Sequence, residues 1–209
     1  MTLLPAFGDP PPPVAVAEAA RTLAGGWPVG LPTDTVYGLA ADPFRPGATD
    51  RIFAAKRRPR DVALPVLVTG RDQALTLTTA VPDLALGLME RFWPGALTLV
   101  LPSRADLAAD LGDDEVTVGV RCPAHPVARA LCQAAGPLAT TSANFHGGAT
   151  FTTAREVEAA FGALVPVVLD AGTCTGRPST VVDCTGLEPK LLREGRIPWA
   201  EVLAVLAGD

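Results

Sequence analysis

Apolar residues recur along this chain at helical spacing in several stretches. The spacing predicts helices over residues 14–24 and 52–57, in a segment ending near Arg91, over 127–135, after Thr153, and from Pro198 onward. Local end signals support these helices. Pro13 precedes the first helix and Gly25-Gly26 follow it, Thr49 or Asp50 is expected to cap the second, and Thr153 and Glu156 have the spacing of a capping box.

Shorter apolar runs rich in Val and Leu occur in eight stretches, from which we predict a sheet of about seven strands. The stretches are residues 27–32, 64–68, 96–101, 115–120, 137–141, 165–169, 179–183 and 189–194. Helices and strands alternate for most of the chain, but the last three strands are nearly consecutive. We therefore expect an α/β fold with a twisted mixed sheet flanked by helices, because a purely parallel sheet would need a crossover between each pair of strands.

The N-terminal segment differs in composition from the rest. Residues 1–13 form a Pro-rich arm that ends in Pro10 to Pro13, which we expect to be loosely ordered, whereas residues 14–209 read as one domain. The chain begins without a basic segment followed by an apolar one, and no apolar run approaches the ~18 residues of a membrane span. These features predict a cytoplasmic protein without a membrane partner.

Composition narrows the class of function. The 209 residues are 48% hydrophobic and 19% charged with a net charge of −5, which excludes a disordered polyelectrolyte and disfavours a protein that coats nucleic acid. The four cysteines form no CxxC pair and are expected to be reduced structural thiols. Cys122 and His125 could supply half a metal site, but His146 is the only other histidine, so no protein-bound metal is expected.

Basic residues are concentrated in one short segment. Residues 51–60 hold five of the 17 basic side chains and no acid. Either this segment is a solvated helix end, which favours cations, or it binds an anion such as a phosphate chain.

Polar loops at the ends of predicted strands offer the other groups of a binding site. They are residues 32–35 (PTDT), 140–148 (TTSANFHGG), 177–180 (RPST) and the LLREG segment that contains Arg193. The chain contains neither GxxxxGK[ST] nor GxGxxG after a strand, and Ser142 is not in a G-x-S-x-G elbow. A pocket assembled from these loops and the basic segment is therefore favoured over a P-loop, a Rossmann site or a serine hydrolase.

In these same segments the chain resembles the YrdC-type threonylcarbamoyl-AMP synthases of tRNA modification. The resemblance rests on PTDTVYGLAADP, the K-x-R-P run from Lys56 to Pro59, FWPGALTLVL, VGVRCPAHP, TSAN, and STVVD followed by LLREG. It covers residues 14–196, and the chain is similar to the short, single-domain form of the family. It implies a YrdC-like sheet with a large basic cavity, and formation of threonylcarbamoyl-AMP and pyrophosphate from L-threonine, bicarbonate and ATP.

The resemblance also implies roles for individual residues. The reaction centre would comprise Lys56, Arg58, Ser142 and Asn144. These four would contact ATP together with Thr117, Thr150 and Arg193, and Mg²⁺ would arrive with the ATP. Threonine would be bound by Thr35, Arg121, Thr140 and Ser179.

The chain departs from the family pattern at four positions. Where longer members have K-x-R-P-x-x-N-P-L and a following histidine, this chain has Val62, Ala63 and Leu67, and Pro178 replaces the Glu that often precedes the STVVD serine. Contacts through those Asn and His side chains cannot form here.

Two other functions remain open on the residues alone. The same fold could bind structured RNA without catalysis, or form another carbamoyl or acyl adenylate. The resemblance implies that the labile product passes to a separate tRNA threonylcarbamoyl transferase complex, and strong direct binding of tRNA is not expected from the acidic net charge.

Overall fold

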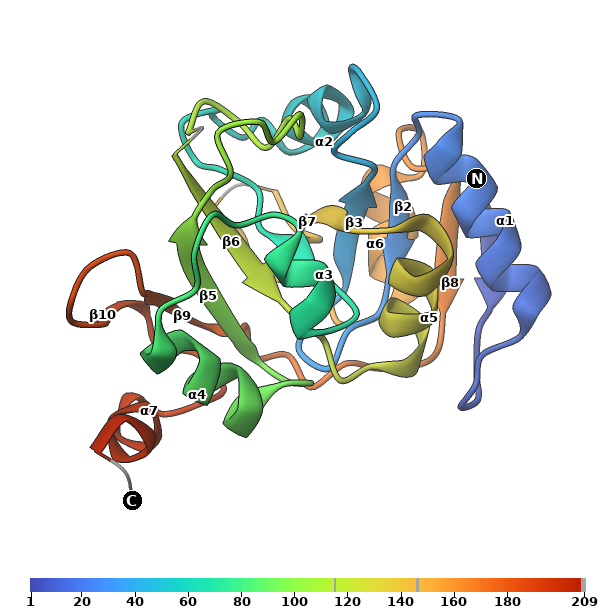
Figure 1. The fold of residues 1–209 in the computed structure, drawn as a ribbon. Coiled ribbons are helices and arrows are strands. Elements are labelled where there is room, and N and C mark those ends of the chain that lie inside the picture. Colours follow the sequence, from blue (N-terminus) through green and yellow to red (C-terminus); the bar gives the residue numbers. More distant parts are fainter. Residues whose placement is uncertain (115, 146, 208–209) are drawn as a thin grey trace.

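A ten-stranded mixed sheet forms the centre of the protein (Figure 1). The computed structural model describes residues 1–114, 116–145 and 147–207, so Glu115 in the expected strand 115–120, His146 in the 140–148 loop and residues 208–209 lie outside it. The strands are β1 (Thr2–Pro5), β2 (Val29–Leu31), β3 (Gly38–Ala41), β4 (Val66–Leu67), β5 (Leu97–Pro102), β6 (Thr117–Arg121), β7 (Leu138–Ser142), β8 (Val167–Asp170), β9 (Thr180–Asp183) and β10 (Lys190–Arg193). The helices are α1 (Pro13–Ala24), α2 (Ala48–Lys56), α3 (Arg71–Leu75), α4 (Asp83–Phe92), α5 (Pro126–Ala135), α6 (Ala154–Phe161) and α7 (Trp199–Ala207).

The sheet order is β1-β8-β2-β3-β7-β4-β6-β5-β9-β10. Neighbouring strands are parallel in β1–β8, β8–β2, β4–β6 and β5–β9, and antiparallel in the other pairs. The prediction of a mixed α/β sheet is confirmed, but the count of about seven strands is too low. The expected strands correspond to β2 and β4–β10, whereas β1 and β3 were not foreseen.

Strand β3 escaped notice because its sequence is GLAA, which lacks the β-branched and aromatic residues on which strand prediction depends. Its partners β2 and β7 supply the hydrogen bonds and the surrounding core. Helix α3 was missed for a related reason, because five residues are too few to show a helical period.

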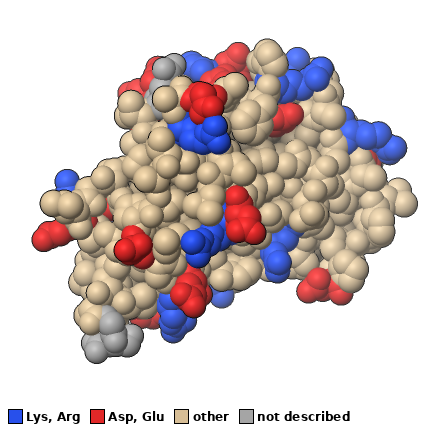
Figure 2. Space-filling view, viewed as in Figure 1, with Lys and Arg blue, Asp and Glu red and all other residues tan. Residues whose placement is uncertain are grey.

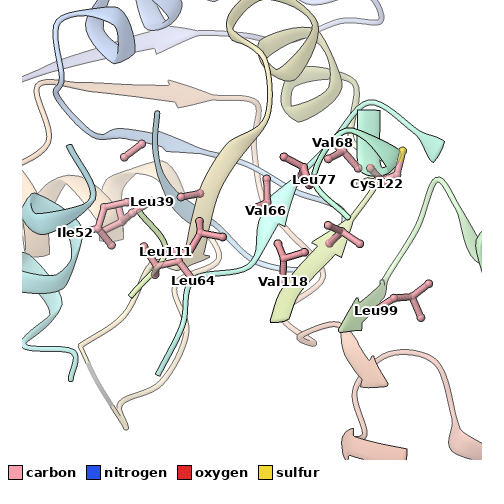
Figure 3. Packing of buried hydrophobic residues seen from close by; sticks show 14 of the residues in the cluster. Leu39, Ile52, Leu64, Val66, Val68, Leu77, Leu99, Leu111, Val118 and Cys122 are labelled. Atoms are coloured by element: carbon pink, nitrogen blue, oxygen red, sulfur yellow. The ribbon is translucent and has the colours of Figure 1, made fainter. Parts of the chain in front are cut away.

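Side chains of the strands alternate between two apolar cores on opposite faces of the sheet. In β8, Val167 and Leu169 pack in the cluster that includes α1 and α5, whereas Val168 packs with Val157 of α6 in the other cluster. Figure 1 shows α1 and α5 on one side of this part of the sheet and α6 behind it. The larger cluster continues through Leu39 and Leu99 across the centre of the sheet (Figure 3). Both faces of this part of the sheet are therefore covered, and successive residues of a strand pack into opposite cores.

Helix ends follow the predicted signals with one exception. The capping box at Thr153 and Glu156 is confirmed. The prediction that Thr49 or Asp50 caps α2 is wrong, because the helix begins after Gly47 in the left-handed region with φ 75°. Thr49 is buried and its hydroxyl donates to Asp110 at 2.7 Å, while Asp50 pairs with Arg60 at 2.5 Å.

The first residues do not form the loosely ordered arm that the prolines suggested. Residues Thr2–Pro5 form β1, which pairs in parallel with β8 from Thr2–Val167 to Pro5–Asp170 at the edge of the sheet. Ala6 is fully buried in the core between α1 and the sheet. The expectation of looseness is wrong for these residues because their pairing with β8 supplies backbone partners.

Membrane insertion is not supported by the helices. Across the described residues, no helix combines the length and the apolar character that a bilayer span requires.

The unforeseen strand β3 provides a test of the core. Leu39 is 0% exposed, so Leu39→Ala should lower the free energy of unfolding by about 2–5 kcal/mol through lost burial and an internal cavity. Chemical denaturation measures the change. Leu187→Ala is the control, because Leu187 is 100% exposed and its loss should cost under about 0.5 kcal/mol. Equal effects of the two substitutions would contradict this packing.

Candidate functional site

A polar cavity opens where the β2–β3 connection meets the ends of β7 and β10 and the start of β9. Its volume is about 150 Å³, and three arginines, Arg58, Arg121 and Arg193, contribute to its wall. A second cavity of about 390 Å³ adjoins it and shares Arg58 and Arg193. The residues that line both cavities are Arg58, Pro65, Thr98, Ser179 and Arg193.

Lys56 lies beside this cavity as the last residue of α2. The helix ends because Arg57 adopts the left-handed conformation with φ 51°, which turns the chain toward Arg58. The Lys56 side chain is 2% exposed, and its ammonium donates to the carbonyl of Ser142 and, at 2.6 Å, to the carbonyl of Asn144. A third bond of 3.0 Å reaches Asn144 Oδ1. All three N–H donors of the ammonium are thus satisfied.

Ser142 and Asn144 complete this group from the end of β7. Ser142 Oγ donates to Asn144 Oδ1 at 2.7 Å, so the amide oxygen accepts from both Ser142 and Lys56. Asn144 Nδ2 donates to the carbonyls of Phe145 and Gly148 at 3.0 and 2.8 Å, which fixes the orientation of its amide. The structure therefore brings three of the four expected reaction-centre residues into one hydrogen-bonded group.

Burial changes the acidity of the lysine. Desolvation, and to a smaller extent the positive charge of Arg58, lower the pKa of Lys56 to about 8. The charged form is the better donor to three oxygens, yet burial disfavours it. An anionic ligand beside Lys56 would favour the cation.

Arg58 is the fourth expected reaction-centre residue, and two carbonyl groups hold it. Its Nε donates to the Val62 carbonyl at 2.8 Å, and Nη2 donates to the Ala63 carbonyl at 2.9 Å. Burial and the neighbouring charge of Arg193 lower the pKa of Arg58 from its ordinary value. The side chain lines both cavities, so its remaining N–H groups are available on the cavity side.

The basic segment 51–60 does not act as one anion site. Arg51 stacks over the ring of Trp27 at 3.9 Å, and Arg57 is exposed. Arg60 forms ion pairs with aspartates, at 2.5 Å to Asp50 and to Asp110 and at 3.4 Å to Asp113. Of the segment, Arg58 lines the cavity, and Lys56 is bonded to Ser142, which lines it as well.

Arg121 ends β6 and carries the most enclosed guanidinium of the cavity wall. It forms an ion pair of 2.7 Å with Asp34, and the two side chains are 8% and 13% exposed. Nη1 donates to Thr35 Oγ1 at 2.9 Å, and Nε donates to the Gly95 carbonyl at 2.9 Å. Burial lowers the pKa of Arg121, and Asp34 opposes that shift.

The expected threonine-binding residues converge on the smaller cavity. Arg121, Thr140 and Ser179 line it, and Thr35 is bonded to Arg121 behind its wall. Ser179 Oγ is hydrogen-bonded to Thr98 Oγ1 at 2.9 Å, and it accepts a bond of 3.1 Å from Arg193 Nη2. Arg193 also donates to the Ser179 carbonyl through Nε at 3.1 Å and through Nη2 at 2.9 Å, which holds β10 against the start of β9.

Two expected ATP contacts lie apart from this group. Thr117 lines the adjoining cavity but not the smaller one, and its hydroxyl donates to Asp114 at 2.5 Å. Thr150 is half-buried before α6 and is not among the residues that line either cavity. Among the positions that depart from the family pattern, Leu67 and Pro178 line the smaller cavity and Val62 and Ala63 line the larger one.

Sequence reasoning missed Asp34 and Thr98. Asp34 lies in the PTDT loop that had been singled out, but its role becomes visible only when β6 brings Arg121 alongside. Thr98 lies in β5, within the FWPGALTLVL segment that carries part of the resemblance, but that segment does not indicate its partner Ser179, which is 81 residues away.

His125 and Cys122 have structural contacts. His125 Nδ1 accepts a hydrogen bond from the backbone of Val127 at 3.2 Å and caps α5, and Cys122 Sγ donates to the Thr69 carbonyl at 3.3 Å. Burial raises the pKa of the Cys132 thiol to about 12. Within the described ranges, no group of three or more His, Cys, Asp or Glu side chains is placed to hold a metal ion.

Known proteins match this chain over most of its length. The Sua5, YciO and YrdC family model, described as telomere recombination, matches residues 21–195. A Mycobacterium tuberculosis protein provisionally named threonylcarbamoyl-AMP synthase is 40% identical over 93% of this chain and 90% of its own. The Bacillus subtilis threonylcarbamoyl-AMP synthase is 40% identical over 91% of this chain and 56% of its own.

Solved structures agree with the sequence matches. Pyrococcus abyssi Sua5 complexed with L-threonine superposes with a TM-score of 0.90 and 34% identity, covering 99% of this chain and 61% of that one. Escherichia coli YciO has a TM-score of 0.86 and 25% identity over 94% of this chain and 97% of its own. The present chain thus spans about three fifths of the Sua5 chain but nearly all of the YciO chain. By sequence and by fold, this chain belongs to the Sua5/YciO/YrdC family.

Proposed function

We propose that this chain is a threonylcarbamoyl-AMP synthase, an enzyme that uses L-threonine, bicarbonate and ATP and releases pyrophosphate. The observation that carries the proposal is the hydrogen-bonded group of Lys56, Ser142 and Asn144 beside a cavity lined by three arginines. Relatives that bear the synthase name at about 40% identity support it.

The arrangement suits a reaction between two anions. In the proposed sequence, the neutral amino group of threonine combines with bicarbonate to give a carbamate and water, and an oxygen of that carbamate then forms a bond to the α-phosphorus of ATP. The bond from that phosphorus to the oxygen bridging to the β-phosphorus breaks, and pyrophosphate leaves with the electron pair. Lys56 and Arg58 would offset charge at the α-phosphate and on the leaving group, while Ser142 and Asn144 would orient the lysine. Positioning and charge thus provide the catalysis, and no histidine base or cysteine nucleophile is needed.

The smaller cavity suits the amino acid. Arg121 would bind the carboxylate of threonine, and Thr35, Thr140 and Ser179 supply hydroxyl groups of the kind that bind a small polar substrate. The P. abyssi Sua5 structure, whose fold this chain shares, contains L-threonine. The cavity volume of about 150 Å³ is compatible with a ligand of that size.

We assign ATP to the adjoining cavity. Arg58 and Arg193 stand between the two cavities, where a phosphate chain would lie, and Thr117 is at the far side. Mg²⁺ would enter bound to the phosphates of ATP and add positive charge to them. The role of Thr150 as an ATP contact remains a prediction from the family resemblance.

The face shown in Figure 2 gives no specific support to the alternative of an RNA-binding module. Figure 2 shows Lys and Arg side chains interspersed with Asp and Glu over the face in view, without one continuous basic area. The net charge of −5 also opposes a large phosphate contact. We therefore propose that the labile product passes, in the cytoplasm, to a separate transferase complex that modifies tRNA.

The proposed reaction has a direct test. Pyrophosphate release from ATP should require L-threonine and bicarbonate together and should be much weaker with L-serine. A coupled phosphate assay measures the release, and omission of each substrate in turn is the control. Release without threonine would support another adenylate-forming reaction. No release together with tight binding of structured RNA would support the RNA-binding function.

Lys56 is the residue on which the chemistry most depends. Lys56→Met should lower pyrophosphate release by about 100- to 1,000-fold, because the positive charge beside the cavity and its bonds to Ser142 and Asn144 are lost while most of the side-chain volume remains. The matched control is Lys190→Met, since Lys190 is the other lysine of the chain and is exposed on β10. Retention of the wild-type rate by Lys56→Met would remove this residue from the reaction.

The pH profile gives a second measure of the lysine. Because burial lowers the pKa of Lys56 to about 8, its cation predominates below pH 8 and is lost above it. The value of kcat/KM for ATP, which reports the pKa values of the free enzyme, should therefore fall above about pH 8 in the wild type. Lys56→Arg, which stays charged, should not show this fall if it retains measurable activity.

Arg121 tests the assignment of the two cavities. Arg121→Lys should raise the KM for threonine by about tenfold, because an ammonium cannot reproduce the planar set of bonds to Asp34, Thr35 and the Gly95 carbonyl. The KM for ATP should change by less than about twofold, and steady-state kinetics measure both. The control is Arg104→Lys, an exposed arginine paired with Asp106. A raised KM for ATP with an unchanged KM for threonine would move Arg121 to the nucleotide.

A further inference from the structure

Asp34 and Arg121 form an ion pair in which both partners are nearly enclosed. Asp34 Oδ1 accepts from Arg121 Nη2 at 2.7 Å and from the backbone N–H of Ala124 at 3.0 Å. The carboxylate therefore contacts both the last residue of β6 and the turn that follows it. Among the ion pairs of the described residues, the others have at least one partner that is more than a third exposed.

The backbone of Asp34 is fixed as firmly as its side chain. Its carbonyl accepts from Arg196 Nη1 at 2.6 Å and from Thr175 Oγ1 at 3.1 Å. The next residue, Thr35, accepts from Gly176 N at 2.9 Å through its own carbonyl. Segments far apart in sequence thus hold the carboxylate in one place against Arg121.

The contacts of Arg121 limit what it can offer to a ligand. A guanidinium has five N–H groups, and three of them are used, by the Gly95 carbonyl, Thr35 and Asp34. Each terminal nitrogen keeps one N–H. Arg121 lines the cavity, so these two donors form the pair that a carboxylate could bind.

We propose that Asp34 is a positioning residue that orients Arg121 so that its two remaining N–H groups bind the carboxylate of the amino-acid substrate. This inference rests on the proposed function and assigns a role to a residue that is not among those lining the smaller cavity. Asp34 also compensates the charge of Arg121, so the pair recognises the carboxylate by direction of hydrogen bonds more than by net charge.

Orientation and charge predict opposite effects of removing the carboxylate. If attraction between Arg121 and the substrate were governed by net charge, loss of the negative Asp34 would strengthen threonine binding. If Asp34 acts by orienting the guanidinium, its loss weakens threonine binding although the cavity becomes more positive. The sign of the change therefore distinguishes the two roles.

The experiment uses the full chain and two substitutions. Asp34→Asn keeps the size of the side chain and one acceptor oxygen, whereas Asp34→Ala removes both the charge and the acceptor. Isothermal titration with L-threonine in the absence of ATP measures affinity, and titration with L-threoninamide measures it for a ligand without the carboxylate. We expect the Kd for threonine to rise about 3-fold in Asp34→Asn and about 10-fold or more in Asp34→Ala, with the preference for threonine over threoninamide reduced in both.

The controls separate orientation from general damage. Asp106→Ala, which breaks the exposed pair with Arg104, should leave threonine binding unchanged. The KM for ATP should stay within about twofold of wild type in the Asp34 variants, whereas a distorted site would raise it as well. Tighter or unchanged threonine binding, or an unchanged preference over threoninamide in the folded Asp34→Asn protein, would overturn the inference.

Failure of the proposed function would appear differently. A wild-type protein that binds threonine but releases no pyrophosphate would refute the synthase reaction and leave the role of Asp34 intact. A wild-type protein that does not bind threonine would overturn the role of Asp34 at this site.

Discussion

The burial of the Lys56 ammonium against the carbonyls of Ser142 and Asn144 organises the site. A buried cation is costly unless it is fully hydrogen-bonded, and the end of α2 must therefore remain close to the end of β7. This requirement fixes the TSAN loop as well, because Asn144 Oδ1 accepts from the same ammonium and from Ser142. Two segments 86 residues apart thus become one unit at the edge of the cavity.

Two other cations of the cavity are also held by bonds to uncharged oxygen atoms. Arg58 bonds to the carbonyls of Val62 and Ala63, and Arg193 bonds to the carbonyl and hydroxyl of Ser179. Carbonyl and hydroxyl groups orient these side chains without cancelling their charge. In the described part of the chain, Lys56, Arg58 and Arg193 form no ion pair with a carboxylate, whereas Arg121 does. The positive charge is thus largest where the phosphates would lie and is balanced where the amino acid would lie, although the whole protein is acidic.

The sequence allowed the mixed sheet and most helices to be predicted, because their apolar periods are clear. The local sequence pattern did not predict the strands whose structure depends on pairing with distant segments. Strand β1 lies in a segment rich in proline, and β3 consists mostly of small residues. For the site, the motifs located Lys56, Ser142 and Asn144, and the structure brings these side chains together. The sequence could not show that Arg60 forms an ion pair and so does not contribute to an anion site, because its partner Asp110 is 50 residues away.

The departures from the family pattern at Val62 and Ala63 do not remove the contacts that these two positions make with Arg58. Arg58 is bonded to the backbone carbonyls of these residues, and a carbonyl bond does not depend on the side chain at that position. It depends on the path of the chain. That path is held by the bond of 2.7 Å from Leu64 N to the Leu111 carbonyl, and by Gly112, where a Cβ atom would come within 2.5 Å of the Arg60 carbonyl. The connection between β5 and β6 therefore supports Arg58 from outside the cavity, so that Arg58 keeps its place without the asparagine of the longer relatives.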